Sequence, residues 1–400
     1  MQIPVPDPVM DILSALETAG YAAWCVGGCV RDSLMHKTPH DWDITTSADA
    51  RTMMRLFENR RVIPTGLAHG TVTVTTDIGP VEITTYRTDG AYVGHRRPAQ
   101  VLFTDDLHED LKRRDFTVNA MAYHPGFGLV DDFDGVGDLK RGLLRAVGDP
   151  AIRFEEDALR ILRAVRFAAV LGFCIEPQTF RALMEKRDDL RYISGERIAQ
   201  ELEKLVCGRA ALPVLRACAP VLDAALEAEQ QVPWPSRLPD SAQSSLCALL
   251  LTRPDGALDC VLKRLRLPTK IKALAQDAVC VRGALAQRQD PAQILLLLGP
   301  QRALQALGVL AAWGGGYEQA LAQARALLTR QGCWEIGALA IDGQVLRRQG
   351  LCGAQIGQAL RALLRAVALE NCPNTPAALL AALPDILEKI EKTGKGSSDT

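Results

Sequence analysis

Residues 22–48 read AAWCVGGCVRDSLMHKTPHDWDITTSA, and they carry the strongest local signals in the chain. Two apolar, strand-like runs at 22–26 and 42–46 flank a Gly-Gly turn at 27–28, which is followed by Arg31. Adjacent glycines let the backbone approach a ligand closely, and their N–H groups can hold phosphate oxygens beside an arginine. The alternative interpretation is a glycine-rich turn with a surface arginine.

Two aspartates, Asp41 and Asp43, stand at the start of the second strand-like run. Residues i and i+2 of a strand point to the same face, so the two carboxylates can chelate one divalent ion or bridge two. Mg²⁺ prefers carboxylate and phosphate oxygens. Glu82 is the candidate third carboxylate, because it shares a strand face with Thr84 and Tyr86. A solvated pair of aspartates near a turn is the alternative.

The chain is predicted to be an α+β protein with a sheet at its N-terminal end. A helix is expected over 7–19, and two runs of period two, at 71–76 and 81–87, are expected to form a hairpin in a mixed or largely antiparallel sheet. From Asp149 onward nearly every segment has helical composition. The predicted domains are a head (1–147), an all-α neck (148–206), body (207–320) and tail (321–390), and a disordered end (391–400).

Composition excludes several classes of protein. The 400 residues are 48% hydrophobic and 23% charged with a net charge of −1, which is typical of a globular protein with a sizeable core. No uncharged apolar run is long enough to span a membrane, and no secretory signal is present. Eleven scattered cysteines without a Cys-x-x-Cys pair predict reduced thiols and a cytoplasmic location.

These motifs resemble those of the class II nucleotidyltransferases, the family of tRNA CCA-adding enzymes and bacterial poly(A) polymerases. GGCVRD (27–32) followed by DWDITTSA (41–48) carries the resemblance. Further stretches occur in the family's order: GLAHGT (66–71), VEITTYR (81–87), RRDFTVNAMA (113–122), EEDALRILRAVRFA (155–168) and SGERIAQELEKL (194–205). The strong match covers residues 20–206, and a weaker one at 339–364 resembles the tail of the shorter CCA-adding enzymes.

A single helix predicted over 150–170 has a charged half, on which four arginines outnumber the two acidic residues. A solvated face with Glu–Arg pairs is the plain interpretation. The resemblance implies instead that Asp157 and Arg160 act as an amino-acid template for the incoming base. A carboxylate can accept from the amino group of cytosine or adenine, while G and U would leave it unmatched. The charged half comprises Arg153, Glu156, Asp157, Arg160, Arg163 and Arg166.

The resemblance also implies the reaction and its other residues. The RNA 3′-hydroxyl, activated near one Mg²⁺, attacks the α-phosphorus of CTP or ATP, and pyrophosphate leaves with a second ion. Asp41 and Asp43 are the implied metal ligands, with Glu82 as a further catalytic carboxylate. Arg114 maps onto a nucleotide-binding arginine, for which a salt bridge with Asp115 is the alternative. Gly28, Arg31, Arg163 and Arg166 are expected at the triphosphate, the last two alternatively at the RNA 3′ end.

The implied partners are the tRNA 3′ end and the substrates CTP and ATP, with no membrane and no obligatory protein partner. Residues 88–110 match the loop associated in the family with the switch from C to A, which favours full CCA addition. The family usually has an acidic residue where Gly94 stands. The alternatives are poly(A) addition, CC-only or A-only addition, and a non-catalytic RNA-binding protein, which the presence of the catalytic residue types opposes.

Overall fold

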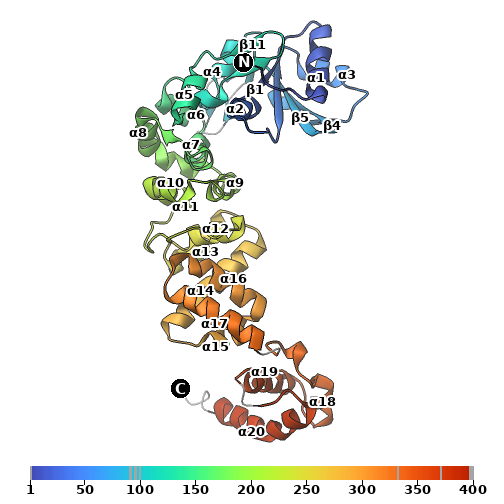
Figure 1. Cartoon of the computed structure of the whole chain (residues 1–400), viewed down its shortest axis with the longest axis vertical. Helices are drawn as coiled ribbons and strands as arrows, with labels where there is room; N and C mark the ends of the chain where they lie inside the picture. Colours follow the sequence, from blue (N-terminus) through green and yellow to red (C-terminus); the bar gives the residue numbers. More distant parts are fainter. Residues whose placement is uncertain are drawn as a thin grey trace. The chain divides into compact units, whose positions relative to one another are not determined.

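The computed structural model describes residues 2–89, 92–93, 97–98, 101–330, 333–369 and 372–395. The chain divides into two compact units (Figure 1). The first contains Met1–Glu229 with Arg264–Arg266, and the second contains Gln230–Lys263 with Leu267–Thr400.

A seven-stranded mixed sheet lies in the first unit, in the order β11-β10-β1-β2-β5-β4-β3. Strands β2 and β5 run parallel, and every other neighbouring pair is antiparallel. The predicted α+β head with a mixed sheet is therefore confirmed. The strands are β1 (Ala23–Val26), β2 (Trp42–Thr46), β3 (Val62–Gly66), β4 (Thr71–Thr76), β5 (Gly79–Thr85), β10 (Ala122–His124) and β11 (Gly128–Val130).

Helices α1 (Asp7–Thr18) and α3 (Ala50–Leu56) pack on one face of this sheet (Figure 1). In α1 the residues Val9, Ile12, Leu13 and Leu16 recur at helical spacing and are fully buried, as the apolar stripe of an amphipathic helix requires. Ile44 of β2 and Ile83 of β5 are register partners in the same core. Because side chains alternate along a strand, their neighbours Asp43 and Glu82 point to the opposite face.

Short elements follow the sheet strand β5. Two ribbons pair β6 (Arg87–Asp89) with β9 (Val101–Phe103), and β7 (Tyr92–Val93) with β8 (Arg97–Pro98). They belong to the segment predicted as a loop at 88–110, and Gly94 lies outside the described residues. The remaining helices of the head are α2 (Gly28–Leu34), α4 (Leu107–Lys112) and α5 (Gly135–Arg141).

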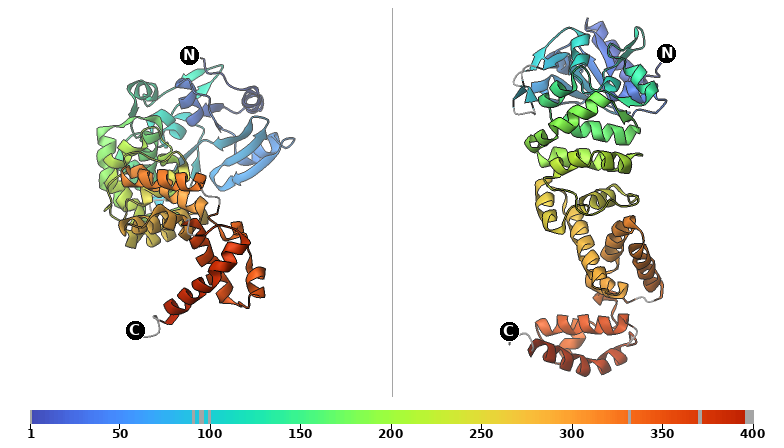
Figure 2. Two further views of the ribbon diagram at one scale, coloured as in Figure 1. Left: turned by 60° about the horizontal axis from the view of Figure 1, so that its bottom comes forward. Right: turned by 90° about the vertical axis from the view of Figure 1, so that its left-hand side faces the viewer.

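Layers of helices follow the head within the first unit, coloured green in Figure 2. As predicted, Asp149 caps the first of them, since its side chain accepts from the N–H of Ala151 at 2.8 Å. The helices are α6 (Pro150–Glu156), α7 (Leu159–Leu171), α8 (Pro177–Lys186), α9 (Gly195–Val206), α10 (Ala211–Ala217) and α11 (Ala219–Leu226).

The prediction of one helix over 150–170 is wrong at its centre. Asp157 is extended, with φ −137° and ψ 103°, and it separates α6 from α7. Its side chain accepts from the N–H of Leu159 at 3.1 Å. This local hydrogen bond competes with the helical ladder, as aspartate side chains commonly do. The break changes the direction of the Asp157 side chain relative to the arginines of α7.

The boundary between the two units falls after Glu229, inside the segment predicted as the body. Leu215 of α10 and Val221 and Leu222 of α11 are fully buried within the first unit, so residues 207–229 group with the head and neck. The boundaries predicted after residues 147 and 320 stay predictions.

The described part of the second unit is helical. Leu346, Leu363 and Leu379 lie in a separate apolar cluster near its C-terminal end. Helix α20 runs to Lys395, so residues 391–395 are helical where disorder was predicted, and 396–400 lie outside the described residues. Of the helices that the structure describes, none has the length and apolar character needed to cross a membrane. The helices of this unit are α12 (Ala242–Leu250), α13 (Asp255–Arg264, which ends in the first unit), α14 (Thr269–Ala286), α15 (Pro291–Leu298), α16 (Pro300–Leu310), α17 (Gly316–Arg330), α18 (Gly343–Arg348), α19 (Ala354–Ala368) and α20 (Pro376–Lys395).

Candidate active site

A cavity of about 480 Å³ in the first unit collects most of the residues singled out in the sequence. Seven of its lining residues are arginines, against three aspartates, so it presents an excess of positive charge that suits a polyanion. The lining residues that the sequence predicted are Gly28, Arg31, Asp43, Arg114, Asp157, Arg160, Arg163 and Arg166. Gly27 belongs to the predicted glycine turn, and the lining residues that the sequence missed are Arg113, Asp115, Asn119, Leu159, Phe167 and Arg197.

The turn between β1 and α2 forms one wall of the cavity. Gly27 has φ +75°, and a Cβ added there would lie 3.2 Å from Nη1 of Arg114 and 4.0 Å from Oδ2 of Asp43. The positive φ favours glycine, and the Arg114 guanidinium would have to shift slightly for any larger residue, whereas the distance to Asp43 is an ordinary contact. Arg31, one turn further on, donates from Nη1 to Oδ1 of Asn119 at 2.7 Å.

The three predicted carboxylates are neighbours, although only one of them lines the cavity. Asp43 of β2 is the register partner of Glu82 on the parallel strand β5, and Asp41 precedes β2 at an exposed position. Burial raises the pKa of Asp43 to about 6; Arg114 opposes this shift, while Glu82 and Asp41 add to it. Among the described residues no group of three or more His, Cys, Asp or Glu side chains could hold a metal ion.

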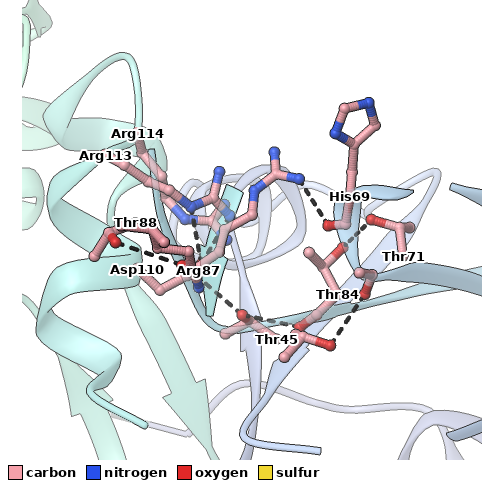
Figure 3. A network of polar contacts seen from close by, with 12 residues as sticks. Thr45, His69, Thr71, Thr84, Arg87, Thr88, Asp110, Arg113 and Arg114 are labelled. Carbon is pink, nitrogen blue, oxygen red and sulfur yellow. Dashed lines mark hydrogen bonds and ion pairs between the residues drawn. The ribbon is translucent and has the colours of Figure 1, made fainter. Parts of the chain in front are cut away.

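Asp110, which sequence reasoning missed, is the centre of a buried polar network beside these strands (Figure 3). Its carboxylate is 0% exposed and accepts from Nη2 of Arg113 at 2.7 Å, Nη2 of Arg114 at 3.2 Å and Oγ1 of Thr45 at 3.0 Å. It also accepts from the N–H of Arg87 at 3.3 Å. Burial acts to raise the pKa of Asp110, but Arg114 and Arg113 outweigh it and hold this pKa below its ordinary value.

A sequence signal for this network exists, because Asp110 stands three and four residues before Arg113 and Arg114, which directly follow the short helix α4. The suggested salt bridge between Arg114 and Asp115 is wrong. Arg114 pairs with Asp110 instead, and Asp115 pairs with Arg163, whose Nε lies 2.7 Å from its Oδ2.

Each of the four arginines around the break at Asp157 has an acidic partner, although two of them share one carboxylate. Arg153 and Arg160 both pair with Glu156. Arg163 pairs with Asp115, and Nε of Arg166 lies 2.8 Å from Oε2 of Glu201 on α9. Two of the acids come from other segments, which a count within 150–170 could not include. Together the four pairs contain Arg153, Glu156, Arg160, Arg163, Asp115, Arg166 and Glu201.

The two residues predicted to recognise the base are both held by specific contacts. Oδ2 of Asp157 accepts from Nη2 of Arg197 at 3.0 Å. Arg160 is 9% exposed and donates from Nη2 to the carbonyl oxygen of Arg113 at 2.9 Å. The structure therefore brings Asp157 and Arg160 to one cavity with defined side-chain positions. Arg197 lies in the stretch SGERIAQELEKL (194–205), which resembles the family, and this stretch could have identified it as a site residue.

Two family models and a relative of nearly the same length match this chain. The model of the Poly A polymerase head domain matches residues 23–145, and that of the probable RNA and SrmB-binding site of polymerase A matches residues 172–217. The chain is 37% identical to the CCA-adding enzyme of Limosilactobacillus fermentum over 398 residues, covering 96% of this chain and 97% of the relative.

Solved structures resemble the chain over nearly its whole length. The CCA-adding enzyme of Bacillus stearothermophilus in complex with CTP matches with a TM-score of 0.76 at 31% identity, covering 97% of this chain and 100% of that one. The CCA-adding enzyme of Thermotoga maritima complexed with tRNA matches with a TM-score of 0.70 at 22% identity, covering 96% of each chain. At 22% identity, this second match shows a shared fold and nothing further.

Proposed function

The chain belongs to the family of CCA-adding enzymes, and on that premise we propose that it adds C, C and A to the 3′ end of tRNA, using CTP and ATP and releasing pyrophosphate. The observation that carries this proposal is one cavity that joins the glycine turn, Asp43 and the pair Asp157 and Arg160. A nucleoside triphosphate needs all three: a place for phosphates, an acidic group beside them and polar groups for the base.

The phosphate end of the nucleotide is assigned to the wall at Gly27 and Gly28. The turn brings backbone N–H groups close to the cavity, and Arg31 and Arg114 stand beside it. Arg31 is oriented by Asn119 and Arg114 by Asp110, so neither guanidinium has to be ordered when the nucleotide binds. Such preorganisation lowers the entropic cost of binding.

The base end is assigned to Asp157 and Arg160. The Asp157 carboxylate accepts from the amino group of cytosine or adenine, and Arg160 donates to the ring acceptors of either base. G or U would place a carbonyl oxygen, instead of an amino group, against this carboxylate, and the lost hydrogen bond costs roughly 1–3 kcal/mol. The contacts of Asp157 with Arg197, and of Arg160 with the Arg113 carbonyl, keep the pair from adapting to the wrong base.

Asp41 and Asp43, with Glu82 nearby, are assigned to Mg²⁺. This ion is usually bound by one or two carboxylates together with substrate phosphates, so a pair fits it without a third protein ligand. When bound there, Mg²⁺ would neutralise charge on the phosphates and lower the pKa of the attacking hydroxyl. The chain itself contributes the Arg114 guanidinium, which offsets the negative charge of Asp43.

A product-length assay tests the proposal. A tRNA lacking its last three nucleotides is incubated with the protein and with CTP, ATP or both. Two added nucleotides with CTP alone, and a third when ATP is also supplied, are expected. A long A ladder would indicate poly(A) polymerase, and a stop after CC in the presence of ATP would indicate partial addition. Folded protein that binds tRNA without extending it would contradict an enzymatic function.

A further inference from the structure

The aromatic ring of Phe167 lies among three cationic side chains. Phe167 belongs to α7, lines the cavity and is 9% exposed. The guanidinium carbon of Arg166 lies 4.1 Å from the ring centroid, and those of Arg31 and Arg163 lie 5.4 Å from it. Significant contacts between a cation and an aromatic face occur roughly once per 70–80 residues, so three on one ring are a concentrated arrangement.

The three arginines come from two different elements. Arg163 and Arg166 precede Phe167 on α7, whereas Arg31 belongs to α2, directly after the glycine turn. The ring also makes an edge contact with Phe116, at 5.8 Å between centroids, and Phe116 is fully buried. Phe167 is therefore anchored in the core and joins the arginines of α7 to the arginine of the turn.

Three guanidinium groups around one ring repel one another. The pKa of Arg166 lies below its ordinary value because burial disfavours the charge; Glu201 opposes this shift, and the positive charges of Arg163 and Arg31 add to it. Each of these arginines also pairs with a carboxylate: Arg31 with Asp32, Arg163 with Asp115 and Arg166 with Glu201. The negative face of an aromatic ring attracts all three cations without carrying a net charge.

We propose that Phe167 is a positioning residue whose ring holds Arg31, Arg163 and Arg166 in place for the triphosphate of CTP or ATP. The inference rests on the proposed function, since it assigns the three arginines to the nucleotide of that reaction. It extends that function by giving an apolar side chain in a charged cavity a role in substrate affinity. Base selection is not assigned to the ring, because its three cation contacts are to arginines assigned to the triphosphate.

Replacement of the ring by an aliphatic side chain tests the proposal. Phe167→Leu keeps an apolar group of similar size but removes the aromatic face. We expect KM for CTP and for ATP to rise by the same factor of about 10, while kcat changes less than about twofold. Phe167→Tyr retains the ring and is expected to keep both KM values within about twofold of the unsubstituted protein.

A matched control separates this effect from lost packing. Phe173 follows α7, is 8% exposed and stands outside the cavity lining, so Phe173→Leu removes a similarly buried ring. It should lower the melting temperature as Phe167→Leu does and leave both KM values unchanged. If Phe167→Leu does not fold, Phe167→Met replaces it as the aliphatic variant, because methionine adapts to irregular core space.

The proposal is overturned if the folded aliphatic variant has unchanged KM values for both nucleotides, or if Phe167→Tyr loses as much affinity as that variant. An increase confined to KM for tRNA also overturns it. Failure of the unsubstituted protein to extend tRNA would count against the proposed function instead. Calorimetric titration with ATP then still tests the ring, with about tenfold weaker binding to the aliphatic variant expected.

Discussion

Arg163 on α7 donates from Nε to Oδ2 of Asp115 at 2.7 Å, across 48 positions of sequence. Asp115 lies in the RRDFT stretch that follows α4, so this pair joins the head to the helix that carries Arg160. Asp115 is 8% exposed and also accepts from Nδ2 of Asn119 at 3.2 Å. The two segments that line the cavity are thereby held together by an ion pair whose carboxylate is buried.

Asp115→Asn is expected to destabilise the first unit. It removes the charged partner of Arg163, whose side chain is 34% exposed although Asp115 itself is buried, so the loss is that of one charged hydrogen bond, about 1.5–3 kcal/mol. The free energy of unfolding from urea denaturation at pH 7 measures the effect. The matched change Asp11→Asn should cost less than about 1 kcal/mol, because the pair of Asp11 with Arg60 is exposed and 3.7 Å long. Equal losses in the two variants would contradict a structural role for the buried pair.

The contribution of Asp115 should depend on pH. Burial acts to raise the pKa of Asp115, but Arg163 and the hydrogen bond from Asn119 outweigh it, and the pKa falls to about 2. The folded-state value lies below the unfolded value of about 3.9, so the stabilisation is present above pH 4 and is lost as the pH falls toward 2. Unfolding free energies of the unsubstituted protein and of Asp115→Asn should therefore converge in this interval. A difference that stays constant down to pH 2 would refute the assignment.

Asp110→Asn is expected to weaken nucleotide binding. The change removes the negative charge that orients Arg113 and Arg114, and KM for both CTP and ATP should rise by about tenfold. Steady-state kinetics with each nucleotide provides the measurement. Asp138→Asn is the control, because Asp138 is also 0% exposed and pairs with Arg141 and Arg145 away from the cavity. Both variants should lose stability, and parallel KM changes in the two would show that the effect is not specific to Asp110.

Asp41→Ala is expected to abolish nucleotide incorporation. Loss of a metal ligand removes several kcal/mol of charge stabilisation, so the rate should fall by about a thousandfold or more. Binding of tRNA, measured by gel shift, should stay nearly intact. Asp77→Ala, in the exposed turn between β4 and β5, is the control and should extend tRNA normally. An Asp41→Ala variant that extends tRNA at the normal rate would disprove the metal assignment.

Arg160→Ala is expected to loosen the choice of base. Without this guanidinium the ring acceptors of cytosine and adenine lose their donor, and selection against UTP and GTP should weaken by roughly ten- to a hundredfold. Misincorporation is measured as the ratio of kcat/KM for each wrong nucleotide to that for the correct one. Arg181→Ala, at an exposed position on α8, should leave this ratio unchanged. Unaltered fidelity in Arg160→Ala would rule out the template role.

Signals carried by neighbouring residues were correctly interpreted from the sequence. The run at 71–76 forms β4, the run at 81–87 forms β5 up to Thr85, the helix at the N-terminus ends within one residue of its predicted bound, and Asp149 caps α6. The family resemblance, which rests on short motifs in a given order, agrees with the match over nearly the full chain. Each of these features depends on residues that are only a few positions apart, and such spacing can be read directly from the sequence.

Long-range partners could not be inferred in this way. Arg163 with Asp115, Arg166 with Glu201 and Asp157 with Arg197 join residues that lie 48, 35 and 40 positions apart. The helix break at Asp157 is local, since its side chain accepts from the N–H of Leu159, but helical periodicity does not reveal it. Local spacing thus specified most of the secondary structure and the family, because backbone preferences act between near neighbours. The three-dimensional fold determines which charges meet in the cavity. A buried charge needs a partner of opposite charge, and in these three pairs that partner comes from a segment far away in the sequence.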